Sequence, residues 1–168
     1  MNEEFAKWII AGGGWLVAIF TLTLGFIERR QAREEERLGR TLDYFEGGSQ
    51  RRGIGIALIE GLWVNKTRHH DVIVPLIANQ IIYLLLSTKS VDAHNERNLV
   101  RMIMILRSIP NLKSKYPERW GDVCDAIARK LEGEQKGIPI SSQTLKTWMQ
   151  ELETENAIQQ QSTPTQNT

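Results

Sequence analysis

The chain has 168 residues, enough for one domain of ordinary size or for a smaller domain with an appendage. Its 21 Lys and Arg nearly cancel its 20 Asp and Glu, and the resulting net charge of +1 excludes a histone-like polycation or an acidic tail as its main feature. Hydrophobic residues make up 41% of the chain, too many for a wholly disordered protein. The lone Cys124 excludes an internal disulfide and any metal site built from several cysteines.

The most apolar segment is residues 8–27, WIIAGGGWLVAIFTLTLGFI, which carries no charge. A helix of that length measures about 30 Å, the thickness of a bilayer's hydrocarbon core. A cleaved signal peptide would need a basic stretch before the apolar run and a small-residue cleavage site after it. The preceding MNEEFAK is net acidic and no such site follows, so the sequence predicts a transmembrane helix that is not cleaved.

Basic residues lie mainly on the C-terminal side of this helix. Lys7 precedes it, whereas Arg29, Arg30, Arg33, Arg37 and Arg40 follow it. Because Lys- and Arg-rich flanks stay in the cytoplasm, we expect a single-pass protein of the cell (inner) membrane, with membrane lipid as one partner. Residues 1–7 are expected outside and the C-terminal domain in the cytoplasm. The cytoplasm is a reducing compartment, which agrees with the single unpaired Cys124.

Small residues recur along residues 8–27 at steps of three and four. This spacing places them on one helical face. Small side chains allow a second helix to approach closely inside a membrane, so the stripe predicts self-association of the chain. Its members are Ala11, Gly14, Ala18, Thr21 and Gly25.

Residues 28–46 carry dense charges of both signs and have a helical composition, which predicts that the membrane helix continues into a charged stalk. Gly47 and Gly48 then break it. In residues 50–64, spaced small residues favour a buried helix, while the alternation of Ile54 and Ile56 with glycine leaves a short strand as the alternative.

Four further helices are expected in the domain at residues 50–156. Asp71 is a plausible N-cap for an apolar core helix over 72–86, with a membrane-dipping element within residues 53–86 as the alternative. Residues 92–109 have a clean amphipathic pattern. A helix over 116–133 and one capped by Ser141 or Ser142 follow, and the polar residues 157–168 are expected to be a disordered tail. The sequence therefore predicts an all-α fold with a cytoplasmic bundle of about five helices.

Two groups of basic residues are candidates for binding an anion or a partner. Arg51 and Arg52 lie near the expected start of a helix, where the helix dipole favours an anion. The remaining candidates share one face of the 92–109 helix: His94, Arg97 and Arg101.

No catalytic, metal or cofactor site is expected, and we expect the protein not to be an enzyme. The run His69, His70 and Asp71 is consecutive and converges poorly on one ion, with no fourth ligand in sight. No histidine is paired in the sequence with a carboxylate in the manner of a general acid–base couple.

The sequence thus predicts a membrane-anchored helical protein that homo-oligomerises through its transmembrane helix and stalk. This architecture is similar to that of membrane-acting effectors of bacterial antiviral defence of the abortive-infection kind. A structural subunit or adaptor of a larger membrane complex, with a protein partner on the cytoplasmic domain, is the first alternative.

The second alternative is a membrane-tethered regulator. Residues 126–131 and 140–148 resemble the two helices of a helix-turn-helix DNA-binding unit. About nine residues, 132–140, separate the two helices, whereas that unit has a turn of three or four. Lys146 is the only cation of the second segment, so a nucleic acid partner is not expected.

The charge asymmetry gives a first testable prediction, which concerns topology. A reporter fused after Thr168 should behave as a cytoplasmic protein in cells, because five arginines follow the apolar segment and one lysine precedes it. A C-terminal tag protected from protease inside sealed inverted vesicles would contradict this orientation.

Overall fold

The computed structural model describes residues 3–88, 92–134 and 136–161, with side chains described from residue 20 to residue 154 within these ranges. The described part is 84% helical and contains no strand, which confirms the all-α prediction. The chain divides into two compact units, Met1–Asp43 and Tyr44–Thr168.

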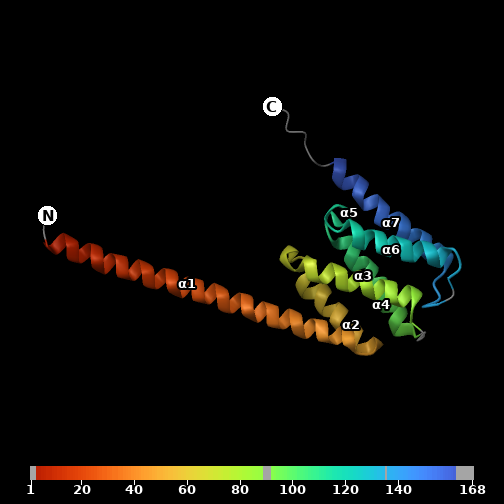
Figure 1. The fold of residues 1–168 in the computed structure, drawn as a ribbon, viewed down its shortest axis with the longest axis horizontal. Coiled ribbons are helices and arrows are strands. Elements are labelled where there is room, and N and C mark those ends of the chain that lie inside the picture. Colours follow the sequence, from red (N-terminus) through yellow and green to blue (C-terminus); the bar gives the residue numbers. More distant parts are fainter. Residues whose placement is uncertain (1–2, 89–91, 135, 162–168) are drawn as a thin grey trace. The chain divides into compact units, whose positions relative to one another are not determined.

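The first unit consists of the helix α1 (Glu3–Asp43), a single 41-residue helix without a break (Figure 1). At 1.5 Å per residue it is about 60 Å long. The apolar residues 8–27 and most of the charged stalk thus share one continuous helix, as the sequence suggested. Within the predicted small-residue stripe, the side chains of Ala11, Gly14 and Ala18 lie outside the described residues, and Thr21 and Gly25 lie inside them.

A 3-10 turn at Tyr44–Glu46 opens the second unit, and α2 (Ser49–Leu58) follows. Its last turn widens into a π-helical segment, Ile59–Trp63, in which the N–H of Val64 donates to the carbonyl of Ile59 at 3.1 Å. The helical interpretation of residues 50–64 is therefore confirmed over the strand.

Two of the glycines in this segment are needed for close packing. A Cβ at Gly55 would lie 2.7 Å from Cε2 of Phe45, and a Cβ at Gly53 would lie 3.2 Å from Oδ1 of Asn98. Glycine costs a helix about 1 kcal/mol relative to alanine, and at these two positions the close contact offsets that cost.

The core is built around α3 (His70–Leu86), which lies between α4 and α6 (Figure 1). Eight of its residues are buried: His70, Ile73, Val74, Ile77, Ala78, Ile81, Leu84 and Leu85. A 3-10 turn at Thr67–His69 leads into it, so the N-cap position belongs to His69. The prediction that Asp71 caps this helix is wrong, because Asp71 already lies in the first turn.

The amphipathic helix expected over 92–109 is α4 (Ala93–Ser108), which packs against both α2 and α3. Asp92 is its N-cap, with the carboxylate accepting from the backbone N–H of Asn95 at 2.8 Å. Its buried apolar residues include Leu99, Met102, Ile103 and Leu106, in agreement with the amphipathic pattern of the sequence.

The remaining helices are α5 (Leu112–Lys115), α6 (Pro117–Leu131) and α7 (Ser142–Gln161). Pro117 occupies the first turn of α6, and Ser141 caps α7 by accepting from the N–H of Thr144 at 3.1 Å. The one-turn α5 was not anticipated. The helix α7 extends into the segment expected to be a disordered tail, whose last residues, 162–168, lie outside the described residues.

The connection between α6 and α7 is fixed to the end of α3. The N–H of Ile138 donates to the carbonyl of Leu84 at 2.9 Å, and the Ile138 side chain is buried. Gly137 has a φ of +83°, and a Cβ at this position would overlap the backbone carbonyl of Leu85. Only glycine fits both the backbone conformation and the contact.

A pair of glycine substitutions tests this contact. Gly137→Ala should lower the free energy of unfolding by about 3–5 kcal/mol, because a strained φ and an overlap with the α3 backbone add together. Gly133 is the control, since it also has a positive φ of +105° but no heavy atom within 4 Å of its Cβ position. Gly133→Ala should cost only about 1–2 kcal/mol. Equal losses for both variants in denaturant unfolding would contradict the packing role of Gly137.

Candidate functional site

The packed pair of helices α2 and α4 carries all five basic candidates for anion or partner binding. Arg51 and Arg52 lie in the first turn of α2. The others lie along α4 in the order His94, Arg97 and Arg101.

Arg52 lies in the interface of the two helices. It is only 9% exposed, and its Nη1 donates to Oδ1 of Asn95 at 2.9 Å. Its Nε is buried without a hydrogen-bond partner in the part of the chain that the structure describes. Asn95 also binds the capping carboxylate of Asp92, whose pKa is lowered chiefly because the backbone N–H of Asn95 favours the charged form. Asn95 thus connects Arg52 to the N-terminal cap of α4, and this buried connection favours a structural role for Arg52.

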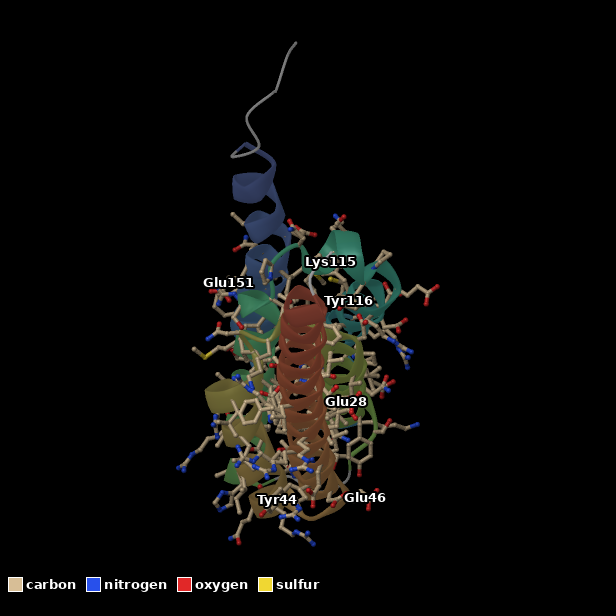
Figure 2. The ribbon with its side chains drawn as sticks, turned by 90° about the vertical axis from the view of Figure 1, so that its left-hand side faces the viewer. Glu28, Tyr44, Glu46, Lys115, Tyr116 and Glu151 are labelled. Carbon is tan, nitrogen blue, oxygen red and sulfur yellow. The ribbon has the colours of Figure 1, made fainter. Side chains whose placement is uncertain are left out.

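Arg51, in contrast, is exposed. Its guanidinium lies 5.8 Å from the centre of the Tyr44 ring, within the range of a cation–π contact (Tyr44 is labelled in Figure 2). Such a contact at an exposed site contributes about 0.5–1 kcal/mol, so Arg51 stays accessible.

Arg101 forms a link back to α2. Its Nε donates to Oε1 of Glu60 at 3.1 Å, and a second bond joins its Nη2 to Oε2. Its Nη1 also donates to the carbonyl of Gly53 at 3.4 Å. The bidentate pair occupies most of the guanidinium's donors, which leaves Arg101 less able to bind another anion.

His94 and Arg97 are exposed, and Arg97 makes no ion pair among the described residues. An open hollow of about 540 Å³ beside them is lined by Ala93, Glu96, Arg97, Val100 and Arg101. Within this set, Arg97 is the cation with donors to spare for a carboxylate or a phosphate. The structure therefore brings Arg97 and Arg101 to one hollow and places Arg52 in the core of the interface.

The residues His69, His70 and Asp71 each have a separate partner. His69 stacks edge-on against Trp63, with ring centres 5.0 Å apart, and Nε2 of His70 lies 2.7 Å from the carbonyl oxygen of Val64. Asp71 accepts from the hydroxyl of Tyr116 at 2.7 Å, and burial together with this carboxylate raises the pKa of Tyr116 to about 12 (Figure 2 labels Tyr116). Among the described residues, no group of three or more metal-binding side chains occurs.

Cys124 lies in α6 and is buried. Burial, reinforced by the nearby carboxylates of Glu153 and Asp125, raises the pKa of its thiol to about 11. The thiol is therefore protonated near neutral pH, which is unfavourable for a nucleophile or a metal ligand.

The described end of the apolar run in α1 exposes large apolar side chains on two sides of the helix. At about 100° per residue these side chains fall in two separate sectors, and the side between them carries Thr21 and Gly25 of the small-residue stripe. The large apolar side chains are exposed by 44–75% and comprise Phe20, Leu22, Leu24, Phe26 and Ile27. A helix that exposes large apolar side chains on two sides needs an apolar environment on both of them.

One helical stretch of the described residues, Thr67–Leu86, is long and apolar enough to cross a membrane. Half of it is buried inside its own unit, where α3 forms the core. Since core helices of soluble proteins share these properties, the stretch by itself supports membrane association only weakly.

The region that resembles a helix-turn-helix lacks the tight turn of that unit. The helix α6 ends at Leu131 and α7 begins at Ser142, and the connection runs back to α3 through Ile138. No protein-family model, curated protein or solved structure matches the chain.

The link between α2 and α4 can be tested by reversing charges. Arg101→Glu should lower the free energy of unfolding by about 0.5–1 kcal/mol, a melting shift of about 3 °C, because it replaces a half-exposed ion pair with two like charges. Adding Glu60→Arg to this variant should restore most of the loss. Arg97→Glu, which makes the same change in charge without breaking an ion pair, should melt as the wild type. Failure of the double reversal to recover stability would show that the pair contributes nothing.

Proposed function

We propose that the protein is a single-pass, membrane-anchored helical protein whose copies associate through the transmembrane part and the stalk of α1. In this proposal α1 crosses the cell (inner) membrane with residues 1–7 outside, and the unit Tyr44–Thr168 is its cytoplasmic domain.

The observation that carries the proposal is the exposure of large apolar side chains on two sides of α1. Phe20, Leu22 and Phe26 are each at least 66% exposed on one unbroken helix. Burying one such side chain contributes about 1.5–3 kcal/mol, so leaving several in water would be costly. A bilayer surrounds a helix on every side and removes this cost for the whole run, residues 8–27.

Gly25 supports association through the small-residue stripe. A Cβ placed on it would meet no heavy atom within 4 Å, so the chain itself does not need a glycine there. The absence of a side chain therefore leaves room at this position for a neighbouring helix, in line with close helix packing in membranes.

A membrane-acting effector of a bacterial defence system is the specific form of this proposal. It rests on the analogy of architecture, in which a small anchored protein clusters and perturbs the bilayer. The assembly and the perturbation are separate steps, so they can be measured separately.

The proposal is tested by enlarging the stripe. Gly25→Ile, and likewise Gly14→Ile, should shift the purified full-length protein in mild detergent toward the mass of a monomer, because branched bulk keeps the helices apart. Light scattering coupled to size exclusion measures the particle mass. Dye release from vesicles containing the same variants measures the effector step, and it should fall together with the mass.

Leu24→Ile is the matched control, since it adds little volume and lies away from the stripe on the same helix. It should keep the wild-type mass. If Gly25→Ile and Gly14→Ile also keep the wild-type mass, association through the stripe is wrong. Release of the wild-type protein from membranes by alkaline carbonate would refute the anchor itself.

A further inference from the structure

The stalk part of α1 carries its arginines on one side of the helix. Taking 100° per residue, Arg29, Arg33 and Arg37 fall within about 80° of one another. Together with Arg30 and Arg40 they occupy a sector of about 100°, which we call the arginine face. Phe26, near the end of the apolar run, lies at the middle of this sector. Of the acidic residues, Glu28, Glu34 and Glu35 lie outside this sector, while Glu36 lies at its edge.

Three of these arginines have no ionic partner within the part of the chain that the structure describes. The described ion pairs of the stalk join Arg30 to Glu34 at 3.9 Å and Arg40 to Glu36 at 2.5 Å. Arg29, Arg33 and Arg37 are exposed and make no ion pair among the described residues. The acidic and basic residues of the stalk are nearly equal in number, yet the arginines on this face are not all balanced by nearby carboxylates.

The arginine face is also shaped to receive a ligand group. A hollow of about 490 Å³ runs along it, lined by Phe26, Arg29, Arg30, Arg33, Glu34 and Arg37. Four guanidinium groups on a single hollow present many donors to one anion, and guanidinium matches the geometry of phosphate. The exposed Phe26 ring, at 70% exposure, gives the hollow an apolar end.

The position along the helix selects the kind of anion. Arg29 and Arg33 lie about 3 Å and about 9 Å past Ile27, the last residue of the apolar run. Side chains on a helix lean toward its N-terminus, so these arginines lean back toward the apolar end. If residues 8–27 span the bilayer, this is the depth of the lipid headgroups, and Phe26 lies at the acyl boundary.

We propose that Arg29, Arg33 and Arg37 bind the phosphate groups of anionic phospholipids, so that the stalk gathers these lipids around the anchor. The inference rests on the proposed membrane anchor and adds the class of lipid that it prefers. A basic cluster next to a membrane helix typically attracts anionic lipid, whereas the same residues have little to gain from a zwitterionic one.

The test uses the full-length chain in vesicles. A donor fluorophore is placed through Gln31→Cys, on the side of α1 away from the arginines, and the burial of Cys124 keeps the label off the native thiol. The vesicles are phosphatidylcholine with a trace of acceptor-labelled phosphatidylglycerol or, in parallel, acceptor-labelled phosphatidylcholine. We expect energy transfer from the donor to the labelled lipids to show a preference of about fivefold or more for the anionic lipid. A fivefold preference corresponds to the contribution of about one arginine at an anionic membrane surface.

Two variants isolate the arginine face. Replacing Arg29, Arg33 and Arg37 by Gln should bring the preference to near unity, and so should about 0.5 M salt, where the screening length falls to about 4 Å. The control replaces three exposed lysines of the other unit by Gln, with the same change in charge, and should keep the wild-type preference: Lys115, Lys136 and Lys146.

The outcomes separate this inference from the anchor. A wild-type protein that resists carbonate extraction but shows no lipid preference would overturn the lipid inference and leave the anchor standing. A preference that survives the triple arginine change would also overturn it. Loss of the wild-type protein from the vesicles on carbonate extraction would overturn both.

Discussion

The second unit depends on covering α3, a helix with apolar residues on nearly every side. Its fully buried side chains, such as Ile73, Ile77 and Ile81, each contribute about 1.5–3 kcal/mol when removed from water, as an upper estimate. Two amphipathic helices, α4 and α6, pack directly against it. The helix α2 packs against α4, and α7 packs against α6 and α4. The second unit is therefore built outward from its most apolar helix, α3.

The parts of the fold that the sequence could predict are those with local signals. The helix α4 has a capping Asp92 and a regular apolar stripe, α6 has Pro117 in its first turn, and α7 has the cap Ser141. Each of these signals acts within four residues of the position it specifies, so no knowledge of the tertiary structure is needed. The continuity of α1 agrees with the lack of proline between residues 8 and 43, although this range contains five glycines, three of them consecutive at 12–14.

The features that the sequence could not predict depend on residues far apart in the chain. Arg101 was expected to face solvent with His94 and Arg97, yet it is paired with Glu60, 41 positions earlier. Asp71 was expected to cap a helix, but its carboxylate binds Tyr116, 45 positions later. Neither partner is specified by spacing, and the packing of α2 on α4 and of α3 on α6 brings each pair together. Among the basic candidates, sequence reasoning therefore could not separate buried Arg52 from exposed Arg97.

The widened turn at Ile59–Trp63 makes the number of residues in this stretch a structural parameter. A π-type turn holds one residue more than the corresponding α-type turn, and its hydrogen bond from Val64 to Ile59 closes the larger ring. Removing the extra residue would close this stretch as an ordinary α-helical turn and leave the residues downstream at nearly the same rotation relative to Ile56. Trp63, which is only 1% exposed, would then keep its place against His69. A removal elsewhere in α2 would instead rotate the downstream residues by about 100°. A one-residue deletion should therefore be better tolerated in this stretch than elsewhere in α2, and related chains should vary here in length by a single residue.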